Sequence, residues 1–191
     1  MKKAIITIAG SLGSGKSSTG KALALALGFK HYSSGDLFRK MAAERGVSVE
    51  AINQTAEIQK DLDHYVDEWL KELYRTEENF VVDSRMAWHW MPESFKIFLA
   101  LDQDTAAERI FNHAKEGSRV SEDAHSVADV RASIERRFIS EQKRYFDLYG
   151  VNPTDTLNFD MILTTKNNNL KTVTNIARAA YDAWRNTEKT L

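Results

Sequence analysis

The chain has 191 residues, of which 42% are hydrophobic and 28% are charged, an ordinary balance for one soluble globular domain. Lysine and arginine number 26 against 27 aspartates and glutamates, and the net charge of −1 gives no reason to expect a nucleic-acid or membrane partner. The absence of cysteine excludes disulfides and thiolate chemistry and favours a cytoplasmic location. No stretch approaches the roughly 20 apolar residues that span a bilayer, and the N-terminal apolar run is too short for a secretory signal.

The first predicted elements are a strand over 4–9, a glycine-rich loop and a helix over 18–27. The loop, Gly10 to Ser17, fits the pattern G-x-x-x-x-G-K-[ST] at each fixed position. Glycines let the backbone N–H groups curl around phosphate, while Lys16 can reach the β- and γ-phosphates and the Ser17 hydroxyl can bind Mg²⁺. A glycine-rich turn with a surface lysine is the alternative, which the flanking strand and helix disfavour. The sequence therefore predicts a nucleotide phosphate site at a helix N-terminus.

The rest of the chain alternates between strands and helices. Strands are expected over 29–32, 79–83, 95–101 and 159–163, and helices from the cluster 33–36 through 45 and over 48–75, 104–115, 126–149 and 170–184. Asp36 or Ser34 is expected to cap the first of these helices, and Asp104 the helix that it begins. Because each strand is too apolar for a sheet with one wet face, we predict an α/β fold with a parallel sheet covered on both faces.

An acidic residue and an arginine follow one of these strands. Asp83 ends the strand over 79–83, and Arg85 comes two residues later. Since ligands bind beyond the carboxyl ends of parallel strands, Asp83 can hold Mg²⁺ or its water opposite Ser17, and Arg85 can contact a phosphate in the same crevice. A helix or turn cap is the alternative for Asp83.

The long predicted helix over 126–149 carries Arg137, Glu141 and Arg144 at spacings i, i+4 and i+7, which places them on one face. At about 100° per residue this face borders the apolar stripe of the helix instead of opposing it. The stripe consists of Ile134, Phe138 and Tyr145. We therefore favour a place for the three charged residues in a site. Structural pairing of arginine with glutamate, worth about a few tenths of a kcal/mol, stays open as the alternative.

Other residues give weaker indications. Arg39 lies one helical turn after Gly35, and a solvated side chain is the alternative to a role in binding. Arg119 lies in a polar loop that can close over phosphates or be only a loop. The five histidines show no metal-ligand spacing. Trp88, Trp90 and Trp184 are expected in the core or a cleft wall, and a solvated face is expected from Asp61, Asp63, Asp67 and Glu68.

Four segments together resemble the nucleoside monophosphate kinases, and within them the compact branch of the cytidylate kinase family. These segments are the loop over 10–17, the stretches over 33–39 and 81–87, and the helix from 137 to 150. The resemblance runs from about residue 3 to the last helix. It implies one P-loop kinase domain over 1–191, with a three-layer fold around a five-stranded parallel sheet, a monophosphate-binding insertion over 33–78 and a short lid over 113–125.

The resemblance also implies transfer of the γ-phosphoryl group of ATP to CMP or dCMP, with Mg²⁺. The residues that it places in catalysis are Lys16, Arg85, Arg137 and Arg144. Those placed on ATP are Gly10, Ser11, Leu12, Gly13, Ser14, Gly15, Lys16, Ser17, Ser18, Arg109 and Arg119. Those placed on the acceptor are Ser34, Gly35, Arg39, Arg85, Arg137, Glu141 and Arg144. Ser17 and Asp83 are placed on the metal.

The chain departs from the family pattern at a few positions. Ser84 stands where glycine is usual, Met86 is apolar as in the compact branch, and the lid is poor in arginine, with Arg109 matching well and Arg119 by position only.

Two alternatives to this function stay open. One is the same chemistry on AMP, UMP or a small metabolite, and the other is an ATP-binding regulatory switch without acceptor kinase activity. The small size of the family's members favours a monomer.

Overall fold

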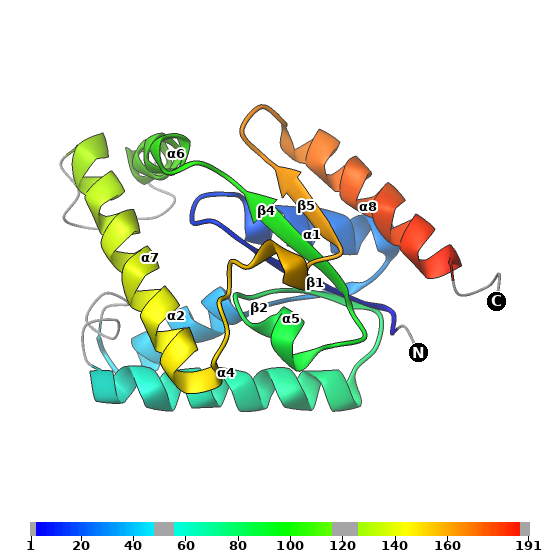
Figure 1. Cartoon of the computed structure of the whole chain (residues 1–191), viewed down its shortest axis with the longest axis horizontal. Helices are drawn as coiled ribbons and strands as arrows, with labels where there is room; N and C mark the ends of the chain where they lie inside the picture. The colour runs from blue at the N-terminus through cyan, green and yellow to red at the C-terminus, as the bar shows by residue number, and fades with distance from the viewer. Residues whose placement is uncertain (1–2, 48–55, 116–125, 188–191) are drawn as a thin grey trace.

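The structure, a computed structural model, describes residues 3–47, 56–115 and 126–187. Over these ranges five strands form one parallel sheet in the spatial order β2-β3-β1-β4-β5 (Figure 1). The strands are β1 (Ile5–Gly10), β2 (Lys30–Ser33), β3 (Phe80–Asp83), β4 (Phe95–Ala100) and β5 (Met161–Thr164). The predicted α/β class and the five-stranded parallel sheet are confirmed.

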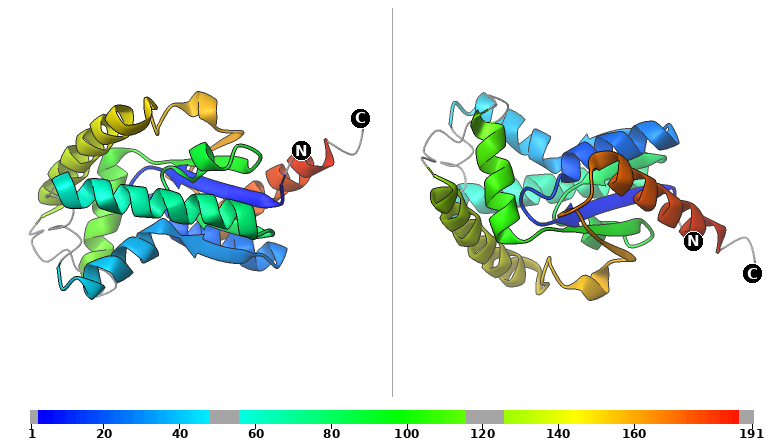
Figure 2. Two further views of the ribbon diagram at one scale, coloured as in Figure 1. Left: turned by 90° about the horizontal axis from the view of Figure 1, so that it is seen from below. Right: turned by 90° about the horizontal axis from the view of Figure 1, so that it is seen from above.

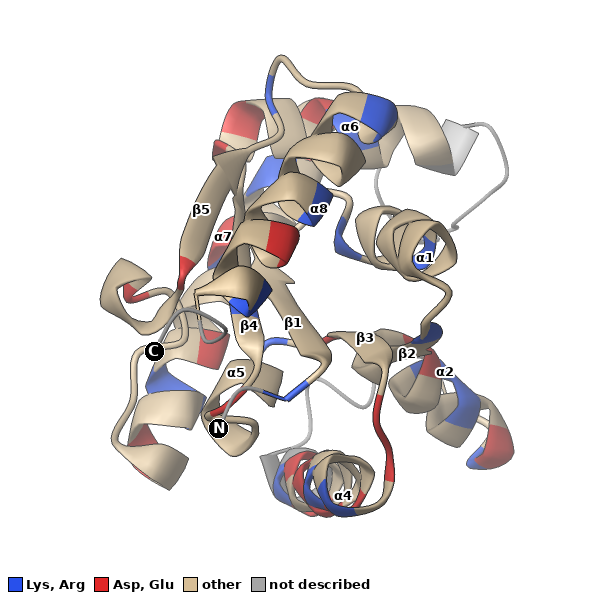
Figure 3. Cartoon of the chain, turned by 90° about the vertical axis from the view of Figure 1, so that its right-hand side faces the viewer, with Lys and Arg blue, Asp and Glu red and all other residues tan. Residues whose placement is uncertain are grey.

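Two layers of helices cover this sheet, as Figures 2 and 3 show. The helices are α1 (Lys16–Leu27), α2 (Ser34–Glu44), α4 (Ala56–Thr76), α5 (Ala87–Trp90), α6 (Gln103–Lys115), α7 (Val127–Tyr149) and α8 (Leu170–Asn186). On one face α1 and α8 bury a cluster with the strands that includes Leu23 and Ala177. On the other face α4 and α5 bury a cluster that includes Leu70 and Phe80. Both faces of the three central strands, β1, β3 and β4, are therefore dry, which explains why these strands are apolar runs without alternation.

The two remaining long helices stand beyond the carboxyl ends of the strands. α6 and α7 pack on each other through a small apolar cluster that includes Ala106, Val130 and Ile134. Figure 1 shows α7 passing from α6 down to α4, across the edge where the strands end. β1 lies between β3 and β4. The chain runs from β1 to β2 on one side of it and later crosses from β3 to β4 on the other, so this edge contains the switch in strand order where ligands bind in such folds.

Helix caps fall one to three residues before the predicted ones. Ser33 caps α2 by accepting a hydrogen bond from the Asp36 amide at 3.3 Å, whereas the sequence favoured Asp36 or Ser34. Asp102, not Asp104, accepts from the Thr105 amide at 3.0 Å where α6 begins. Two short elements were missed, α5 and a 3₁₀ turn over Thr156–Asn158, because neither is long enough to show a period. The part of the predicted helix over 48–55 lies outside the described residues.

The prediction of a solvated acidic face on α4 is wrong for two of its four residues. Asp61 and Glu68 are exposed, whereas Asp63 and Asp67 are only 7% and 4% exposed. Their partners come from distant parts of the chain, Arg144 for Asp63 and the Trp90 and Tyr149 side chains for Asp67. The helix pattern alone does not reveal such partners. Within the described ranges, no helix combines the length and the apolar character needed to cross a membrane.

The cap of α8 offers a stability test that involves none of the residues assigned to ATP, the acceptor or the metal. Asn169 accepts a hydrogen bond from the Thr172 amide at 2.9 Å. We expect Asn169→Ala to lower the free energy of unfolding by about 1 kcal/mol, because it leaves a helix N-terminal amide without its acceptor. Urea denaturation measures the change, with Asn167→Ala at an exposed neighbouring position as the control. Equal stability of the two variants would contradict this account of the cap.

Candidate active site

The glycine-rich loop joins β1 to α1 in the conformation that the motif predicts. Gly10 has φ of +142°, and a Cβ atom at this position would lie 2.2 Å from the carbonyl oxygen of Leu99 on the neighbouring strand. Gly15 precedes α1 with φ of +84°. The amide of Ser11 donates to the Leu99 carbonyl at 3.0 Å, which ties the loop to β4. The loop thus lies at the N-terminus of a helix, where unpaired amides and the helix dipole favour a phosphate.

Lys16 extends back over this loop. Its Nζ atom donates to the carbonyl oxygens of Gly10 at 2.9 Å and Ser11 at 2.8 Å. Burial and the nearby positive charge of Arg85 lower the pKa of Lys16 to about 7, against the opposing pull of Glu141 and Asp83. Within the described residues, only neutral carbonyl groups accept hydrogen bonds from the ammonium, and its buried, positively charged surroundings favour the neutral amine over the ammonium. A bound anion would therefore stabilise its charged form.

Asp83 collects hydrogen bonds from two elements beside the loop. Its Oδ1 atom accepts from the hydroxyls of Ser17 at 2.9 Å and Ser33 at 3.1 Å, and its Oδ2 atom lies 2.9 Å from Nε2 of His31. The parallel register pairs Ser33 with Asp83 and so brings the end of β2 beside the carboxylate. The hydroxyl of Ser34 reaches the Asp83 carbonyl at 3.4 Å. Because the side chain of Asp83 is bound by side chains from α1 and β2, its role is not that of a helix or turn cap.

His31 is a member of this cluster that sequence reasoning missed. Gly20, in the middle of α1, leaves it room, because a Cβ atom there would lie 2.7 Å from Nε2 of His31. A glycine inside a helix costs about 1 kcal/mol relative to alanine and usually has a packing reason. Gly20 was therefore the available signal that another side chain lies against α1.

Ser17 and Asp83 have the chemistry that Mg²⁺ requires. Both offer oxygen, and their side chains already meet at 2.9 Å. The described residues hold no cluster of three or more histidine, cysteine or acidic side chains that would cage a metal unaided. Mg²⁺ usually binds through one or two protein oxygens together with substrate phosphates and water, so the pair fits this ion as part of a nucleotide site.

A second charged cluster faces the loop from α7. Glu141 pairs with Arg85, whose Nε lies 2.6 Å from Oε2, and with Arg137, whose Nε lies 3.1 Å from Oε1. Burial and the charge of Arg85 lower the pKa of Arg137. Two guanidinium groups and the Lys16 ammonium thus share Glu141 and Asp83 as counter-charges. The cluster is net positive when Lys16 is charged. It is more than a structural ion pair along one helix, since Arg85 follows β3. Such a cluster favours anionic ligands.

The remaining predicted residues lie farther out. Arg144 pairs with Asp63 of α4 at 2.6 Å and not with Glu141. Arg39 pairs with Asp36 on α2, both side chains about half-exposed, and its guanidinium passes over Gly35. Arg109 donates to the carbonyls of Thr165 at 2.6 Å and Lys166 at 3.1 Å in the loop after β5. Arg119 and most of the predicted lid lie outside the described residues.

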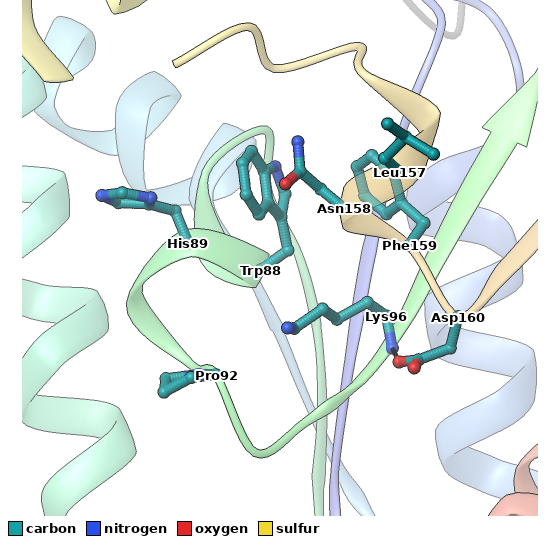
Figure 4. A pocket seen from close by; sticks show the side chains of 8 residues that line it. All are labelled: Trp88, His89, Pro92, Lys96, Leu157, Asn158, Phe159 and Asp160. Atoms are coloured by element: carbon teal, nitrogen blue, oxygen red, sulfur yellow. Dashed lines mark hydrogen bonds between the residues drawn. The ribbon is translucent and has the colours of Figure 1, made fainter. Parts of the chain in front are cut away.

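Of two hollows among the described residues, one borders the loop and the other does not. A cavity of about 230 Å³ is lined by loop residues Gly10 to Leu12, by apolar residues of α6 and α7, and by Arg85 and Glu141. The other, of about 320 Å³, lies around the start of β4, at the opposite end of that strand from the loop (Figure 4). Its lining consists of Trp88, His89, Pro92, Lys96, Leu157, Asn158, Phe159 and Asp160. We place the active site at the first, because both the phosphate loop and the charged cluster of Arg85 and Glu141 line it.

Known structures share this fold. A shikimate kinase from Bacteroides thetaiotaomicron superposes with a TM-score of 0.65 at 15% identity, over 93% of this chain and 98% of the other. A gluconokinase from Sinorhizobium meliloti superposes with a TM-score of 0.60 at 17% identity, over 100% of this chain and 98% of the other. At such low identity the likeness concerns the fold alone.

Sequence comparison identifies the family. Residues 5–167 match the cytidylate kinase-like family. A cytidylate kinase from Thermoplasma volcanium is 35% identical over 84% of this chain and 82% of the relative. Another from Methanocella arvoryzae is 35% identical over 93% of this chain and 97% of the relative, and one from Pyrococcus abyssi is 34% identical over 93% of each. The phosphate loop, the parallel sheet and this match over most of its length together mean that the chain belongs to the cytidylate kinase-like family.

Proposed function

We propose that the protein is a cytidylate kinase, which transfers the γ-phosphoryl group of ATP to CMP or dCMP and yields ADP and CDP or dCDP. The observation that supports this most strongly is the pairing of the phosphate loop with a second cationic cluster, Arg85 and Arg137 around Glu141. One loop suffices for the phosphates of a donor. A second set of cations beside it suits a second phosphate, as a transfer between two nucleotides requires.

On the donor side, the loop amides and Lys16 would hold the triphosphate. The Lys16 ammonium would exchange the carbonyls of Gly10 and Ser11 for phosphate oxygens, which carry more negative charge. Ser17 and Asp83 would hold Mg²⁺, which when bound neutralises charge on the β- and γ-phosphates. Ser33 and His31 would orient the Asp83 carboxylate. Ser18, Arg109 and Arg119 are proposed to complete the ATP site.

On the acceptor side, Arg85 and Arg137 would bind the monophosphate and the group in transfer. In the free protein Glu141 holds both guanidinium groups in place, so little reorganisation is needed when the anion arrives. We also assign Ser34, Gly35, Arg39 and Arg144 to the acceptor, within an insertion over 33–78 and under a lid over 113–125. Closing of these segments would exclude water and suppress ATP hydrolysis. The proposed substrates are small molecules and the proposed active form is a monomer.

An acceptor panel tests this function. ADP release is measured with ATP and Mg²⁺ in the presence of CMP, dCMP, UMP or AMP. We expect CMP and dCMP to give kcat/KM values at least about tenfold above that of AMP, which corresponds to about 1.4 kcal/mol of discrimination. A clear preference for AMP would reject the cytidylate assignment. ADP release that no acceptor stimulates would favour a regulatory switch.

The lowered pKa of Lys16 predicts proton uptake on ATP binding. With a pKa of about 7, most Lys16 side chains are neutral in the free protein at pH 8, and bound phosphates raise the pKa back toward its ordinary value. ATP binding at pH 8 should therefore take up nearly one proton, the uptake should be much smaller at pH 6, and affinity should fall as pH rises above 7. Calorimetry in buffers of different ionisation enthalpy measures this uptake. Equal proton counts at the two pH values would contradict the assignment.

A further inference from the structure

The backbone carbonyl group of Arg85 is anchored by a side chain from the helix that follows it. The indole Nε1–H of Trp88, on α5, donates to this carbonyl oxygen at 2.8 Å. Arg85 lies between β3 and α5, outside the sheet ladder and the helix, and among the described residues no other donor reaches its carbonyl oxygen. The backbone that carries Arg85 thus receives this hydrogen bond from a single tryptophan.

Packing fixes the indole ring that makes this contact. Trp88 is only 6% exposed and belongs to a small apolar cluster with Ala9 and Phe98. The ring centroid of Phe159 lies 5.5 Å from that of Trp88, and Figure 4 shows Trp88 projecting from α5 toward the segment that contains Phe159. Ala9 immediately precedes Gly10, the first residue of the phosphate loop. The ring therefore ties the backbone of Arg85 to the end of β1, where the loop begins.

The single polar group of this side chain is directed at a residue of the proposed site. An indole has one N–H group, which can only donate, and a buried tryptophan usually directs it to a partner. The nearby Trp90 shows a purely structural use of this group, because its Nε1 atom donates to the buried carboxylate of Asp67 at 2.8 Å. Trp88 donates instead to the backbone of Arg85, which we assign to the acceptor.

Glu141 holds the other end of Arg85, and it does so in a different way. Its Oε2 atom lies 2.6 Å from Nε of the guanidinium, which is the group that would bind a phosphate. A phosphate and Glu141 therefore compete for the same N–H groups, whereas the hydrogen bond from Trp88 leaves all of them free. A binding group must be held within about 0.5 Å of its productive place. An anchor that persists when the acceptor arrives meets this need better than a counter-charge that the acceptor displaces.

We propose that Trp88 is a positioning residue for the acceptor phosphate and acts through the backbone of Arg85. This inference rests on the proposed function, since it takes CMP as the acceptor whose phosphate Arg85 binds. It also connects the two hollows, because Trp88 lines the one in Figure 4 and Arg85 lines the one beside the phosphate loop. The effect of Trp88 is carried by its indole N–H and not by contact with a substrate.

The first test is Trp88→Phe, which keeps an aromatic ring in the cluster and removes the indole N–H. We expect kcat/KM for CMP to fall by about tenfold, because a small misplacement of a binding group is costly, while KM for ATP stays within about twofold. Trp184→Phe is the matched control. It removes an indole of α8 that packs on Phe95, and it should leave both values within about twofold of the parent. An unchanged kcat/KM for CMP in Trp88→Phe, or an equal rise in KM for ATP and CMP, would overturn the inference.

A double-mutant cycle with Arg85→Ala separates positioning from a general loss of structure. If Trp88 acts through Arg85, the loss that Trp88→Phe causes should largely vanish once the arginine side chain is gone. We expect Trp88→Phe to lower kcat/KM for CMP by less than about twofold in the Arg85→Ala background. A further loss of about tenfold in that background would show that Trp88 acts independently of Arg85, and would overturn the inference.

An isosteric replacement keeps the test valid if the smaller ring of Trp88→Phe disturbs folding. Benzothienylalanine introduced at position 88 has nearly the shape of tryptophan, with a sulfur atom in place of the N–H group. It should pack normally and still lower kcat/KM for CMP by about tenfold. A value equal to that of the parent would show that the N–H group is not needed, and would also overturn the inference. Failure of the unaltered protein to phosphorylate CMP would instead reject the proposed function, so the two failures are separate.

Discussion

Replacing Lys16 with alanine is expected to reduce kcat for CMP phosphorylation by about 10²–10³-fold, because the variant removes a positioned cation where charge develops on the transferred group. Lys16 lies on the phosphate loop, hydrogen-bonded to two of its carbonyls, and forms no part of the hydrophobic core. The thermal unfolding temperature of Lys16→Ala should therefore change little. Steady-state assays of ADP release measure the effect.

The control for this variant is Lys21→Ala, on an exposed turn of the same helix. It removes an equal charge at a distance from the loop and should keep kcat within about twofold of the unaltered protein, as is usual for surface positions. A Lys16→Ala variant with kcat within tenfold of the parent would mean that the loop binds a nucleotide for some purpose other than phosphoryl transfer.

Arg137→Ala is expected to lower kcat/KM for CMP by about 10²-fold or more. The guanidinium is proposed to bind the acceptor phosphate and the group in transfer, so its loss should affect both binding and the transition state. In the free protein the change leaves Glu141 with Arg85 as its remaining partner at 2.6 Å, which keeps Glu141 paired and limits the cost in stability.

Arg136→Ala is the matched control, because Arg136 is an exposed arginine next to Arg137 on α7. It should leave kcat/KM for CMP nearly unchanged. Similar losses in the two variants would indicate a general effect of charge on α7, and a normal Arg137→Ala enzyme would reject the second cationic cluster as the acceptor site.

The features that sequence predicted well depend on neighbours in the chain. The phosphate loop is a local motif between a strand and a helix, and its glycines sit where the backbone demands them. Arg137 and Glu141 meet because residues four apart share a helix face. The three central strands, β1, β3 and β4, were recognisable because strands covered on both faces need apolar runs. Asp83 was placed correctly beside Ser17 because a strand end and a known loop lie at one edge.

The features that sequence missed depend on tertiary contacts. His31 reaches Asp83 only through the register of β2 with β3, which no local pattern specifies. Asp63 and Asp67 read as surface charges on a polar helix, and their burial is due to Arg144 and Tyr149, about 80 residues away. Arg144 was placed on the correct face of α7, but it was grouped with Arg137 and Glu141, whereas its partner in the structure is Asp63 of α4. α5 is too short for its four residues to show a period.

The most direct test of the central claim follows the labelled γ-phosphoryl group. The protein is incubated with ATP that carries the label in this group, Mg²⁺ and CMP, and the products are separated. We predict that the label appears in CDP in an amount equal to the ADP formed, and that AMP in place of CMP accepts little of it. Label found only in inorganic phosphate, or transferred to AMP in preference to CMP, would contradict the account.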